Sequence, residues 1–378
     1  MSTRSGGELP TLVIGAGVVG LTCAVALARA GRWVVIVDRE RHYGRGTSSR
    51  NSGVIHAGLY YEPGSLKAKL CVDGRERLYG YARERGVPHR RCGKVVVATE
   101  ASELGHIEAI AARARANGVH DVELIGADEL HRLAPPVCGV GALFSPSTGI
   151  VDVHALMDAL ATDATRAGVD FVLGTSLEAA SLGPGGWRIA LRSATGEVEE
   201  AEVEWVVNCA GLYADEVATL ALPPAAAEAL RLDWTRGNYF SIRPAGAAPV
   251  DLLVYPCPPR DRGLGIHLTL DMDGGQRLGP DVEVLPARVE DYSVDPARGG
   301  AFLAAARRYL PHLTADDLAP AFAGIRPQRR MPVPRDFYVA EESAAGAPHW
   351  LNLVGIESPG LTAAFALAEM VSGMVAAG

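Results

Sequence analysis

Three glycines near the N-terminus have the spacing of a phosphate-binding turn. Gly15, Gly17 and Gly20 follow the apolar run TLVI, and Asp38 ends the next apolar run 18 residues after Gly20. The first glycine permits a tight turn, the second lets a pyrophosphate approach the backbone, and the third lets a helix pack on the sheet. The helix N-terminus stabilises the anion, and Asp38 accepts hydrogen bonds from a ribose diol. The pattern predicts a dinucleotide site, and the carboxylate disfavours NADP, which leaves FAD or NAD.

Three other segments favour FAD over NAD. After Asp38 the chain reads RERHYGRGTSSRNSGVIHAG, and its hydroxyl, amide and glycine residues can follow an extended dinucleotide and leave room for a flat ring. The strand VEWVVNCAG ends in Ala210 and Gly211, which allow a close approach to the cofactor. Pro359 and Gly360 begin the C-terminal helix, and a helix N-terminus facing the flavin would stabilise negative charge on the reduced ring.

Several polar residues could bind a small carboxylate substrate. Tyr239 and Tyr255 lie on successive short strands and can donate phenol hydrogen bonds, and His267 lies on the next strand. Aromatic residues on such strands also serve as core, and that alternative stays open. Lys67 and Arg236 are candidate partners for a second carboxylate, with a solvated surface lysine as the alternative.

The elements that position these residues alternate between strands and helices. TLVIGAG and RWVVIVD bracket a helix from Val18 to Ala30, with Gly31 at its C-terminal cap, and form a βαβ unit. Further predicted elements are a strand at 93–99, helices at 104–117 and 152–167, the strand DFVLG, and two antiparallel strands, WRIALRS and EVEEAEVEWVV. The short runs NYFSI, LLVYP, GIHLTL and QRLG predict an antiparallel sheet that covers a ligand. The predicted fold class is α/β plus antiparallel β: a Rossmann-type domain interleaved with an antiparallel substrate domain.

Composition excludes several other classes. The chain has 378 residues, 48% of them hydrophobic, and a formal charge of −8 without a basic block, which argues against nucleic-acid binding. Its six cysteines contain no CxxC pair, so no metal site and no redox dithiol are expected. The N-terminus lacks an apolar signal core, and the apolar C-terminal stretch is interrupted by Glu369. A cytoplasmic protein without a transmembrane segment is expected, and peripheral membrane contact stays open.

Several motifs together resemble the D-amino-acid-oxidase/glycine-oxidase superfamily of FAD enzymes. They are GAGVVGL, TSSRNSGVIHAGLYYEPGSLKAKLC, TGIVDVHAL, NCAGLYAD, RGNYFSI, LGIHLTLD, AGIRP and IESPGLTAAFALAE, and the similarity runs from about Leu12 to Ala376. Within the superfamily the chain most resembles the L-2-hydroxyglutarate dehydrogenase or oxidase branch. It departs from that branch in QRRMPVPRDF after AGIRP and in IESPG near the C-terminus. The resemblance implies an FAD-binding domain at 1–87, 146–232 and 324–378, and a substrate domain at 88–145 and 233–323.

The resemblance also implies roles for individual residues. His56 would be the base that accepts the substrate hydroxyl proton, with packing against the cofactor or covalent attachment to the flavin as alternatives. Arg326 would clamp the substrate carboxylate with two parallel donors, with a surface salt bridge as the alternative. FAD would be bound non-covalently. Its expected contacts are Gly15, Gly17, Val18, Val19, Gly20, Asp38, Arg39, Thr47, Ser48, Ser49, Asn51, Ser52, Gly53, Val54, Leu177, Ala210, Gly211, Arg326, Pro359, Gly360, Leu361 and Thr362.

The sequence therefore predicts an FAD-dependent oxidoreductase that oxidises a small 2-hydroxy acid, such as L-2-hydroxyglutarate, to the 2-oxo acid. The electron acceptor would be oxygen or a quinone. Oxidation of an amino acid on the same fold is the first alternative, and it needs no histidine base if the neutral amine gives up hydride directly. A flavin- or NAD-binding regulator without catalysis is the second. Bleaching of the flavin by candidate substrates separates these three hypotheses.

Overall fold

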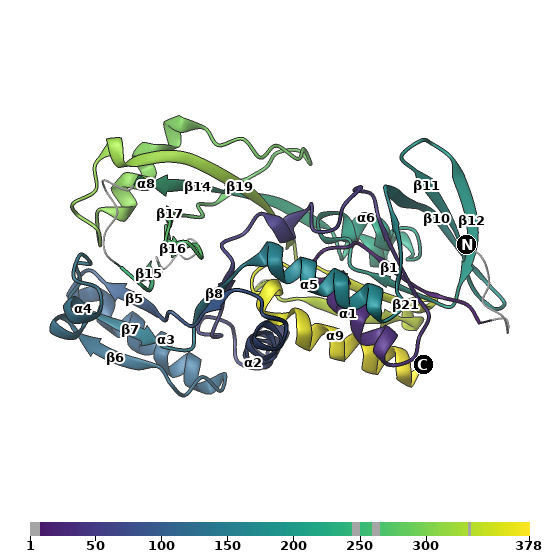
Figure 1. Cartoon of the computed structure of the whole chain (residues 1–378), viewed down its shortest axis with the longest axis horizontal. Helices are drawn as coiled ribbons and strands as arrows, with labels where there is room; N and C mark the ends of the chain where they lie inside the picture. Colours follow the sequence, from purple (N-terminus) through teal and green to yellow (C-terminus); the bar gives the residue numbers. More distant parts are fainter. Residues whose placement is uncertain (1–7, 244–249, 259–264, 332–333) are drawn as a thin grey trace. The chain divides into compact units, whose positions relative to one another are not determined.

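Contacts within the computed structural model divide the chain into two units (Figure 1). The structure describes residues 8–243, 250–258, 265–331 and 334–378. Unit 1 comprises residues 1–49, 153–234 and 326–378, and unit 2 comprises residues 50–152 and 235–325. The chain thus passes between the units four times, after residues 49, 152, 234 and 325.

This division differs from the predicted domains, because residues 50–87 and 146–152 belong to unit 2. The reason is a small antiparallel sheet. In it, β3 (Val54–Ile55) and β4 (His89–Arg90) both pair with β8 (Gly149–Val151). These pairings join both segments to the substrate-domain part of the chain.

A six-stranded sheet forms the centre of unit 1, in the order β20-β21-β13-β1-β2-β9 among the described residues. Five strands run parallel, and only the edge strand β20 is antiparallel to its neighbour. Buried β-branched runs such as VVIVD are typical of a parallel sheet covered on both faces. The strands are β1 (Thr11–Ile14), β2 (Val34–Asp38), β9 (Asp170–Leu173), β13 (Trp205–Asn208), β20 (Tyr338–Glu342) and β21 (Ala347–Val354).

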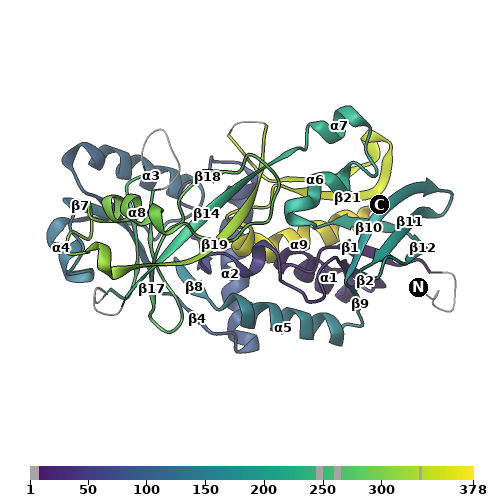
Figure 2. The same ribbon diagram turned by 90° about the horizontal axis from the view of Figure 1, so that it is seen from above.

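Helices and a second sheet complete unit 1. Helix α1 (Val18–Arg29) packs against α9 (Gly360–Ala377) and α5 (Val153–Arg166) (Figure 1). A three-stranded antiparallel sheet, β10 (Thr175–Gly183), β11 (Gly186–Ser193) and β12 (Val198–Val203), lies near β2 (Figure 2). The Trp187 ring of this sheet meets the Trp350 ring of β21 edge-on, with centroids 4.9 Å apart, in one buried core. Two short helices, α6 (Ala214–Ala218) and α7 (Pro224–Glu228), belong to the same unit.

The sequence predicted a single strand for the run EVEEAEVEWVV, but the structure has two strands there, β12 and β13. β12 pairs antiparallel with β11 and is mostly exposed, whereas β13 is fully buried and pairs parallel with β1. The chain changes sheets at Glu204, whose backbone N–H donates to the Pro10 carbonyl. The switch in pattern from charged EVEEAEV to apolar WVV marks this break.

Unit 2 is built on a larger, mostly antiparallel sheet, in the order β18-β14-β17-β16-β15-β5-β7-β6, with β19 paired to β14, among the described residues. Its strands are β5 (Lys94–Ala98), β6 (Glu123–Gly126), β7 (Gly141–Ser145), β14 (Leu232–Ile242), β15 (Leu253–Pro256), β16 (Leu268–Leu270), β17 (Gln276–Leu278), β18 (Glu283–Val284) and β19 (Leu318–Arg329). Its helices are α2 (Leu66–Arg85), α3 (Leu104–Ala116), α4 (Ala127–Leu133) and α8 (Gly299–Ala306). The antiparallel sheet predicted for residues 234–279 is thus present, with β15 and β5 as a parallel pair inside it.

Helix α9 is, within the described ranges, the one helix long and apolar enough to cross a membrane by length and composition. Half of that stretch is buried inside the structure, where α9 packs on α1. A single helix of this kind is weak evidence for a membrane span.

Candidate active site

The glycine turn of unit 1 has the geometry that a dinucleotide site needs. Gly15 has a φ of +101°, and a Cβ there would lie 2.4 Å from the Cys209 carbonyl oxygen. A Cβ on Gly20 would lie 1.8 Å from the Gly15 oxygen, so only glycine allows α1 to start this close to the turn. Gly17 precedes α1 without a side-chain cap, and α1 has no acidic residue in its first turn. The positive end of this helix dipole is therefore suited to an anion.

Asp38 is fixed at the end of β2 by two backbone amides. Its Oδ2 accepts from the Ala16 N–H at 2.7 Å, and its Oδ1 accepts from the Glu40 N–H at 2.8 Å. Burial raises the pKa of Asp38, and the two amide hydrogen bonds oppose that rise. The Asp38 carboxylate thus stabilises the glycine turn through its hydrogen bond to Ala16. Its contact with a ribose stays a prediction. Its neighbour Arg39 lies over the Tyr213 ring, 4.0 Å from the centroid.

The carboxyl ends of β1, β2 and β13 bring the predicted cofactor residues of unit 1 together. Parallel pairing puts Gly15, Asp38 and Cys209 at one edge of the sheet, and Ala210 and Gly211 follow directly. Ligands of open parallel sheets bind outside this edge. The close approach of Gly15 to Cys209 and the uncapped start of α1 fit an FAD pyrophosphate and adenosine.

The hydroxyl-rich segment after β2 lies partly at this turn. The Val18 N–H at the start of α1 donates to Ser48 Oγ at 3.0 Å, and a Cβ on Gly17 would lie 2.8 Å from the same oxygen. Thr47, Ser48 and Ser49 form a short 3₁₀ helix in unit 1. The structure therefore brings Val18 and Ser48 to the glycine turn, and their contacts with a cofactor stay predictions.

The rest of the segment belongs to unit 2. Asn51 Oδ1 accepts from the Gly53 N–H at 2.8 Å, and Gly53 has a φ of +63°. Ser52 Oγ hydrogen-bonds the Tyr239 hydroxyl at 2.9 Å, and Val54 is buried in β3. The sharp turn at Gly53 leads the chain into β3. The predicted flavin contacts of these residues stay predictions.

Further predicted cofactor residues lie on α9 and β10 of unit 1. Pro359 precedes α9, and Gly360, Leu361 and Thr362 form its first turn, which carries neither a side-chain cap nor an acidic residue. This helix end is suited to negative charge on a reduced flavin. Leu177 lies on β10 at an irregularity in the pairing with β11. Its backbone contact with adenine stays a prediction.

Unit 2 gathers a cluster of titratable side chains on one face of its sheet. Lys94 begins β5 and pairs with Leu253 of β15, while Tyr255 pairs with Val96, so all four share a face. The Lys94 ammonium lies 4.6 Å from the Tyr255 ring centroid and 5.0 Å from that of Tyr60. Tyr255 in turn stacks on His267, with centroids 3.5 Å apart and planes 6° from parallel.

Burial is the main cause of the pKa shifts in this cluster. Burial lowers the pKa of Lys94 to about 7. Burial and, next, the Lys94 charge lower the pKa of His56 to about 3. Burial raises the pKa of Tyr60 and of Tyr255, so both phenols stay protonated. Among these four residues only Lys94 changes charge near neutral pH.

The role of His56 as the base for the substrate hydroxyl proton stays a prediction. Its imidazole is neutral and carries a lone pair, and burial, more than the nearby Lys94 charge, disfavours its protonated form. His56 is half-buried and lies between the buried residues Ile55 and Ala57.

Tyr239 and Lys67 also lie in unit 2. Tyr239 is buried, and its ring stacks on Phe322 with centroids 4.4 Å apart. The stacking shows that Tyr239 packs in the core as well as presenting a hydroxyl to Ser52. Lys67 is buried in the first turn of α2, and its predicted role stays a prediction.

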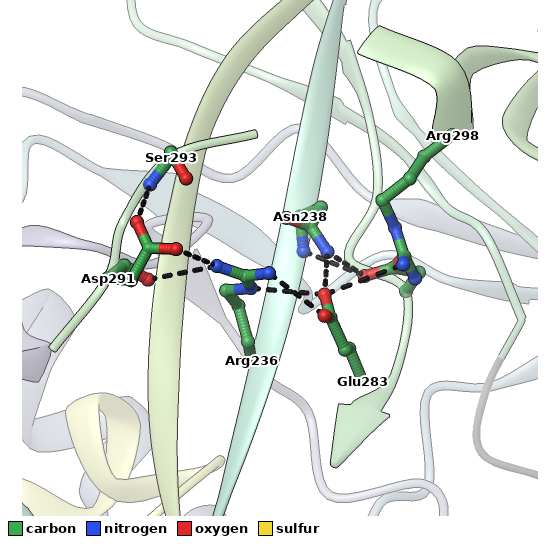
Figure 3. Close-up of polar contacts among 7 residues, drawn as sticks. Arg236, Asn238, Glu283, Asp291, Ser293 and Arg298 are labelled. Carbon is green, nitrogen blue, oxygen red and sulfur yellow. Dashed lines mark hydrogen bonds and ion pairs between the residues drawn. The ribbon is translucent and has the colours of Figure 1, made fainter. Parts of the chain in front are cut away.

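Arg236 is unsuited to the second-carboxylate role considered for it. Figure 3 shows its guanidinium between two carboxylates, with Glu283 at 2.9 Å and Asp291 at 2.8 Å. Asn238 and Arg298 bond to the same acidic group of residues. Both sides of the guanidinium are already used within unit 2, so Arg236 stabilises β14 and β18 rather than offering charge to a ligand.

Arg326 and Arg329 lie near the end of β19, in unit 1. Arg326 is half-buried, and its role as a carboxylate clamp stays a prediction. The Arg329 guanidinium lies over the Tyr338 ring, 5.1 Å from its centroid, and its stem packs against Gly355. Arg329 thus has a packing role in unit 1.

Lys94 is the residue of this cluster that sequence reasoning missed, although the strand GKVVVAT was predicted. The signal was its position in the strand: residues two apart share a face, so Lys94 lies on the same face as Val96 and Ala98, which face the core. A lysine in phase with core residues is buried, and a buried lysine has a perturbed pKa. No group of three or more metal-ligating side chains exists in the described part of the chain.

The comparisons with known proteins agree with this geometry. A match to the FAD dependent oxidoreductase (DAO) family covers residues 11–374. The chain is 37% identical to the mitochondrial L-2-hydroxyglutarate dehydrogenase of Arabidopsis thaliana, over 97% of this chain and 83% of that protein. It is 30% identical to the protein of the same name from Caenorhabditis elegans, over 96% of this chain and 92% of that protein. The solved L-alpha-glycerophosphate oxidase from Mycoplasma pneumoniae with FAD bound has the same fold, at a TM-score of 0.87 and 24% identity over 98% of this chain and 95% of that one.

Proposed function

Given that this chain belongs to the DAO family of FAD-dependent oxidoreductases, we propose that its substrate is L-2-hydroxyglutarate or a similar 2-hydroxy acid, which it oxidises to the 2-oxo acid. The observation that carries the proposal is the similarity to two L-2-hydroxyglutarate dehydrogenases over nearly the whole chain. The cluster around His56 and Lys94 supports it, because alcohol oxidation needs a neutral base for the hydroxyl proton.

Bound FAD supplies the acceptor for the hydride that leaves the substrate carbon. The residues of this chain bind and orient the substrate and take its proton. Arg326 would hold the carboxylate next to the reacting carbon with two parallel hydrogen bonds. His56 would accept the hydroxyl proton as the carbonyl forms, and Tyr255 would offer its phenol hydrogen to a substrate oxygen.

Anaerobic flavin bleaching tests the substrate assignment. The purified protein is mixed without oxygen with L-2-hydroxyglutarate, its D-enantiomer, L-lactate, L-glutamate or glycine, and the flavin absorbance near 450 nm is followed. We expect rapid bleaching by L-2-hydroxyglutarate and slow or no bleaching by the others. Bleaching by an amino acid alone would favour the amine-oxidase alternative, and no bleaching by any of these compounds would reject the proposal.

We further propose that FAD is bound non-covalently and that electrons pass to oxygen or a quinone. Acid precipitation should release all the flavin into the supernatant, and fluorescence remaining on the polypeptide would contradict this. Oxygen uptake, compared with reduction of a soluble quinone, identifies the acceptor. The expected cytoplasmic location stays a prediction, and the two L-2-hydroxyglutarate dehydrogenases named above are mitochondrial.

A further inference from the structure

Lys94 is a lysine on the core face of a buried strand. It is 1% exposed, and its neighbours on that face, Val96 and Leu253, are fully buried. The β5–β15 and β5–β7 pairings fix its backbone, opposite Leu253 on one side and Ser145 on the other. The Lys94 ammonium is therefore held inside unit 2, where it lacks the hydration of a surface lysine.

Hydrogen-bond donors gather around this ammonium. It lies 4.6 Å from the ring centroid of Tyr255 and 5.0 Å from that of Tyr60. The Tyr60 hydroxyl is buried and makes no hydrogen bond within the described residues. Within the same residues, Lys94 forms no ion pair with a carboxylate, and the Tyr255 hydroxyl has no hydrogen-bond partner. An ammonium and two phenols thus lie together with hydrogens to donate and no acceptor among those residues.

This arrangement favours a bound anion. Aromatic ring faces attract a cation, but more weakly than a carboxylate does, because they carry no net charge. A buried ammonium without a counter-charge is costly, and an anion that accepts hydrogen bonds from it offsets that cost. Both oxygens of a carboxylate accept hydrogen bonds, so one carboxylate can serve all three residues at once. The arrangement of Lys94, Tyr60 and Tyr255 is therefore suited to a carboxylate.

The same residues belong to the part of unit 2 that the proposed function assigns to the substrate. There Tyr255 offers its phenol hydrogen to a substrate oxygen, and its ring stacks on His267 with centroids 3.5 Å apart. A dicarboxylic 2-hydroxy acid has a second carboxylate besides the one assigned to Arg326. Arg236, one of the cations first considered for that second carboxylate, is already paired with two acidic side chains. Lys94 has no such pair in the described part of the chain.

Resting on the function proposed above, we propose that Lys94, with the hydroxyls of Tyr60 and Tyr255, binds the second carboxylate of the substrate and selects dicarboxylic over monocarboxylic 2-hydroxy acids. A substrate without that carboxylate leaves the ammonium and both phenols unpaired in a water-poor site. A site built to bind a polar group discriminates strongly against an analogue that lacks the group.

Ligand binding without turnover tests the assignment of Lys94. Glutarate and pentanoate have the same chain length, differ by one carboxylate, and lack the hydroxyl group that is oxidised. Calorimetric titration of the FAD-loaded protein gives the Kd of each. We expect wild type to bind glutarate roughly 30-fold more tightly than pentanoate or better, and Lys94→Met to bind the two within about threefold of each other.

Lys69→Met is the matched control, because Lys69 is exposed on α2, and it should keep the wild-type preference for glutarate. Wild type without a preference for glutarate, or Lys94→Met with the preference unchanged, would overturn the proposal. Equal weakening of both ligands in Lys94→Met would also overturn it, because a merely structural lysine has that effect.

Flavin reduction distinguishes this proposal from the substrate assignment. Lys94→Met should lower the second-order rate with L-2-hydroxyglutarate by roughly 30-fold or more, and leave the rate with L-2-hydroxypentanoate at least as high as in wild type. If L-2-hydroxyglutarate fails to bleach wild type while Lys94→Met loses the glutarate preference, the substrate assignment is wrong and the role of Lys94 stands. If L-2-hydroxyglutarate bleaches wild type and Lys94→Met equally fast, the substrate assignment stands and the role of Lys94 is rejected.

Tyr60→Phe is a second variant, which keeps the ring beside the ammonium and removes only the hydroxyl. We expect glutarate to bind about tenfold more weakly and pentanoate to bind as in wild type, since only the carboxylate accepts the lost hydrogen bond. Circular dichroism and FAD content show whether each variant is folded. A folded Tyr60→Phe protein with the wild-type affinity for glutarate would contradict the part assigned to Tyr60.

Discussion

Asp38 joins the second strand of unit 1 to the glycine turn through hydrogen bonds to Ala16 and Glu40. Asp38→Ala removes both, and each buried amide left without a partner costs about 1–3 kcal/mol. We expect a loss of FAD affinity of tenfold or more, with turnover in excess FAD changed much less, because the carboxylate is remote from the chemistry. Fluorescence titration of apoprotein with FAD measures this. Glu40→Ala, which keeps the backbone amide, should bind FAD normally, and an unchanged affinity in Asp38→Ala would reject the assignment.

Arg326 is the predicted clamp for the substrate carboxylate. A charged hydrogen-bonded pair costs about 2–5 kcal/mol when one partner is truncated in a water-poor site. Arg326→Ala should therefore lower the second-order rate of flavin reduction by roughly 30-fold or more, since about 1.4 kcal/mol is tenfold. Lysine should restore only part of it, because it lacks the two-pronged geometry. Stopped-flow reduction measures the effect.

Arg330 provides the matched control for this substitution. It is an exposed arginine four residues along, paired at the surface with Asp233. Arg330→Ala should reduce its flavin at the wild-type rate. A wild-type rate in Arg326→Ala would reject the clamp assignment, and the carboxylate partner would have to be sought at Lys67, Arg236 or Arg329.

At the residue scale, sequence predicted what depends on local geometry. Gly15, Gly20 and Asp38 were predictable because spacing along the chain determines their positions in a βαβ unit. Lys94 and the charge state of His56 were not, because both depend on strands from distant parts of the chain that pair only after folding. The same holds for Arg236, whose acidic partners lie 47 and 55 residues away.

At the scale of the elements, helices α1 and α9 pack together, and a glycine in each can be compared by the space that a Cβ would have there. Gly20 lies where a Cβ would overlap the Gly15 carbonyl oxygen, whereas nothing lies within 4 Å of a Cβ on the exposed Gly373. We expect Gly20→Ala to prevent FAD binding and to lower the thermal midpoint markedly. Gly373→Ala should raise the unfolding free energy by about 0.5–1 kcal/mol through helix propensity. Calorimetry of both variants measures this, and a fully FAD-loaded Gly20→Ala would contradict the packing argument.

The bounds of the helices and strands show which elements the sequence pattern predicts well and which it does not. α1, α3 and α5 were predicted to within two residues, because their apolar spacing is regular. The change from β12 to β13 was missed, because both strands are extended and only their partners differ.

At the scale of the whole molecule, Lys94 makes stability depend on pH. Its pKa is about 7 in the folded chain against an ordinary value of 10.5, so the unfolded chain binds more protons between these values. The unfolding free energy should therefore rise with pH across this window. Lys94→Met should be more stable than wild type by roughly 3–5 kcal/mol below pH 7, and the difference should vanish near pH 10.5. Urea unfolding at pH 6, 8 and 10 measures it, and a difference independent of pH would contradict the assignment.

The interleaving of the two units affects how the chain is made. In unit 1, β13 pairs with both β1 and β21, and α1 packs against α9. Elements that are synthesised early therefore pack against β21 and α9, which are synthesised last. While the ribosome is still adding residues 347–378, one edge of β13 has no strand beside it, and the part of α1 that α9 later covers is exposed. Open strand edges and exposed apolar faces promote aggregation of nascent chains. Protection by chaperones should therefore matter most in the last moments of translation, and a late stop codon should leave insoluble protein rather than a smaller working enzyme.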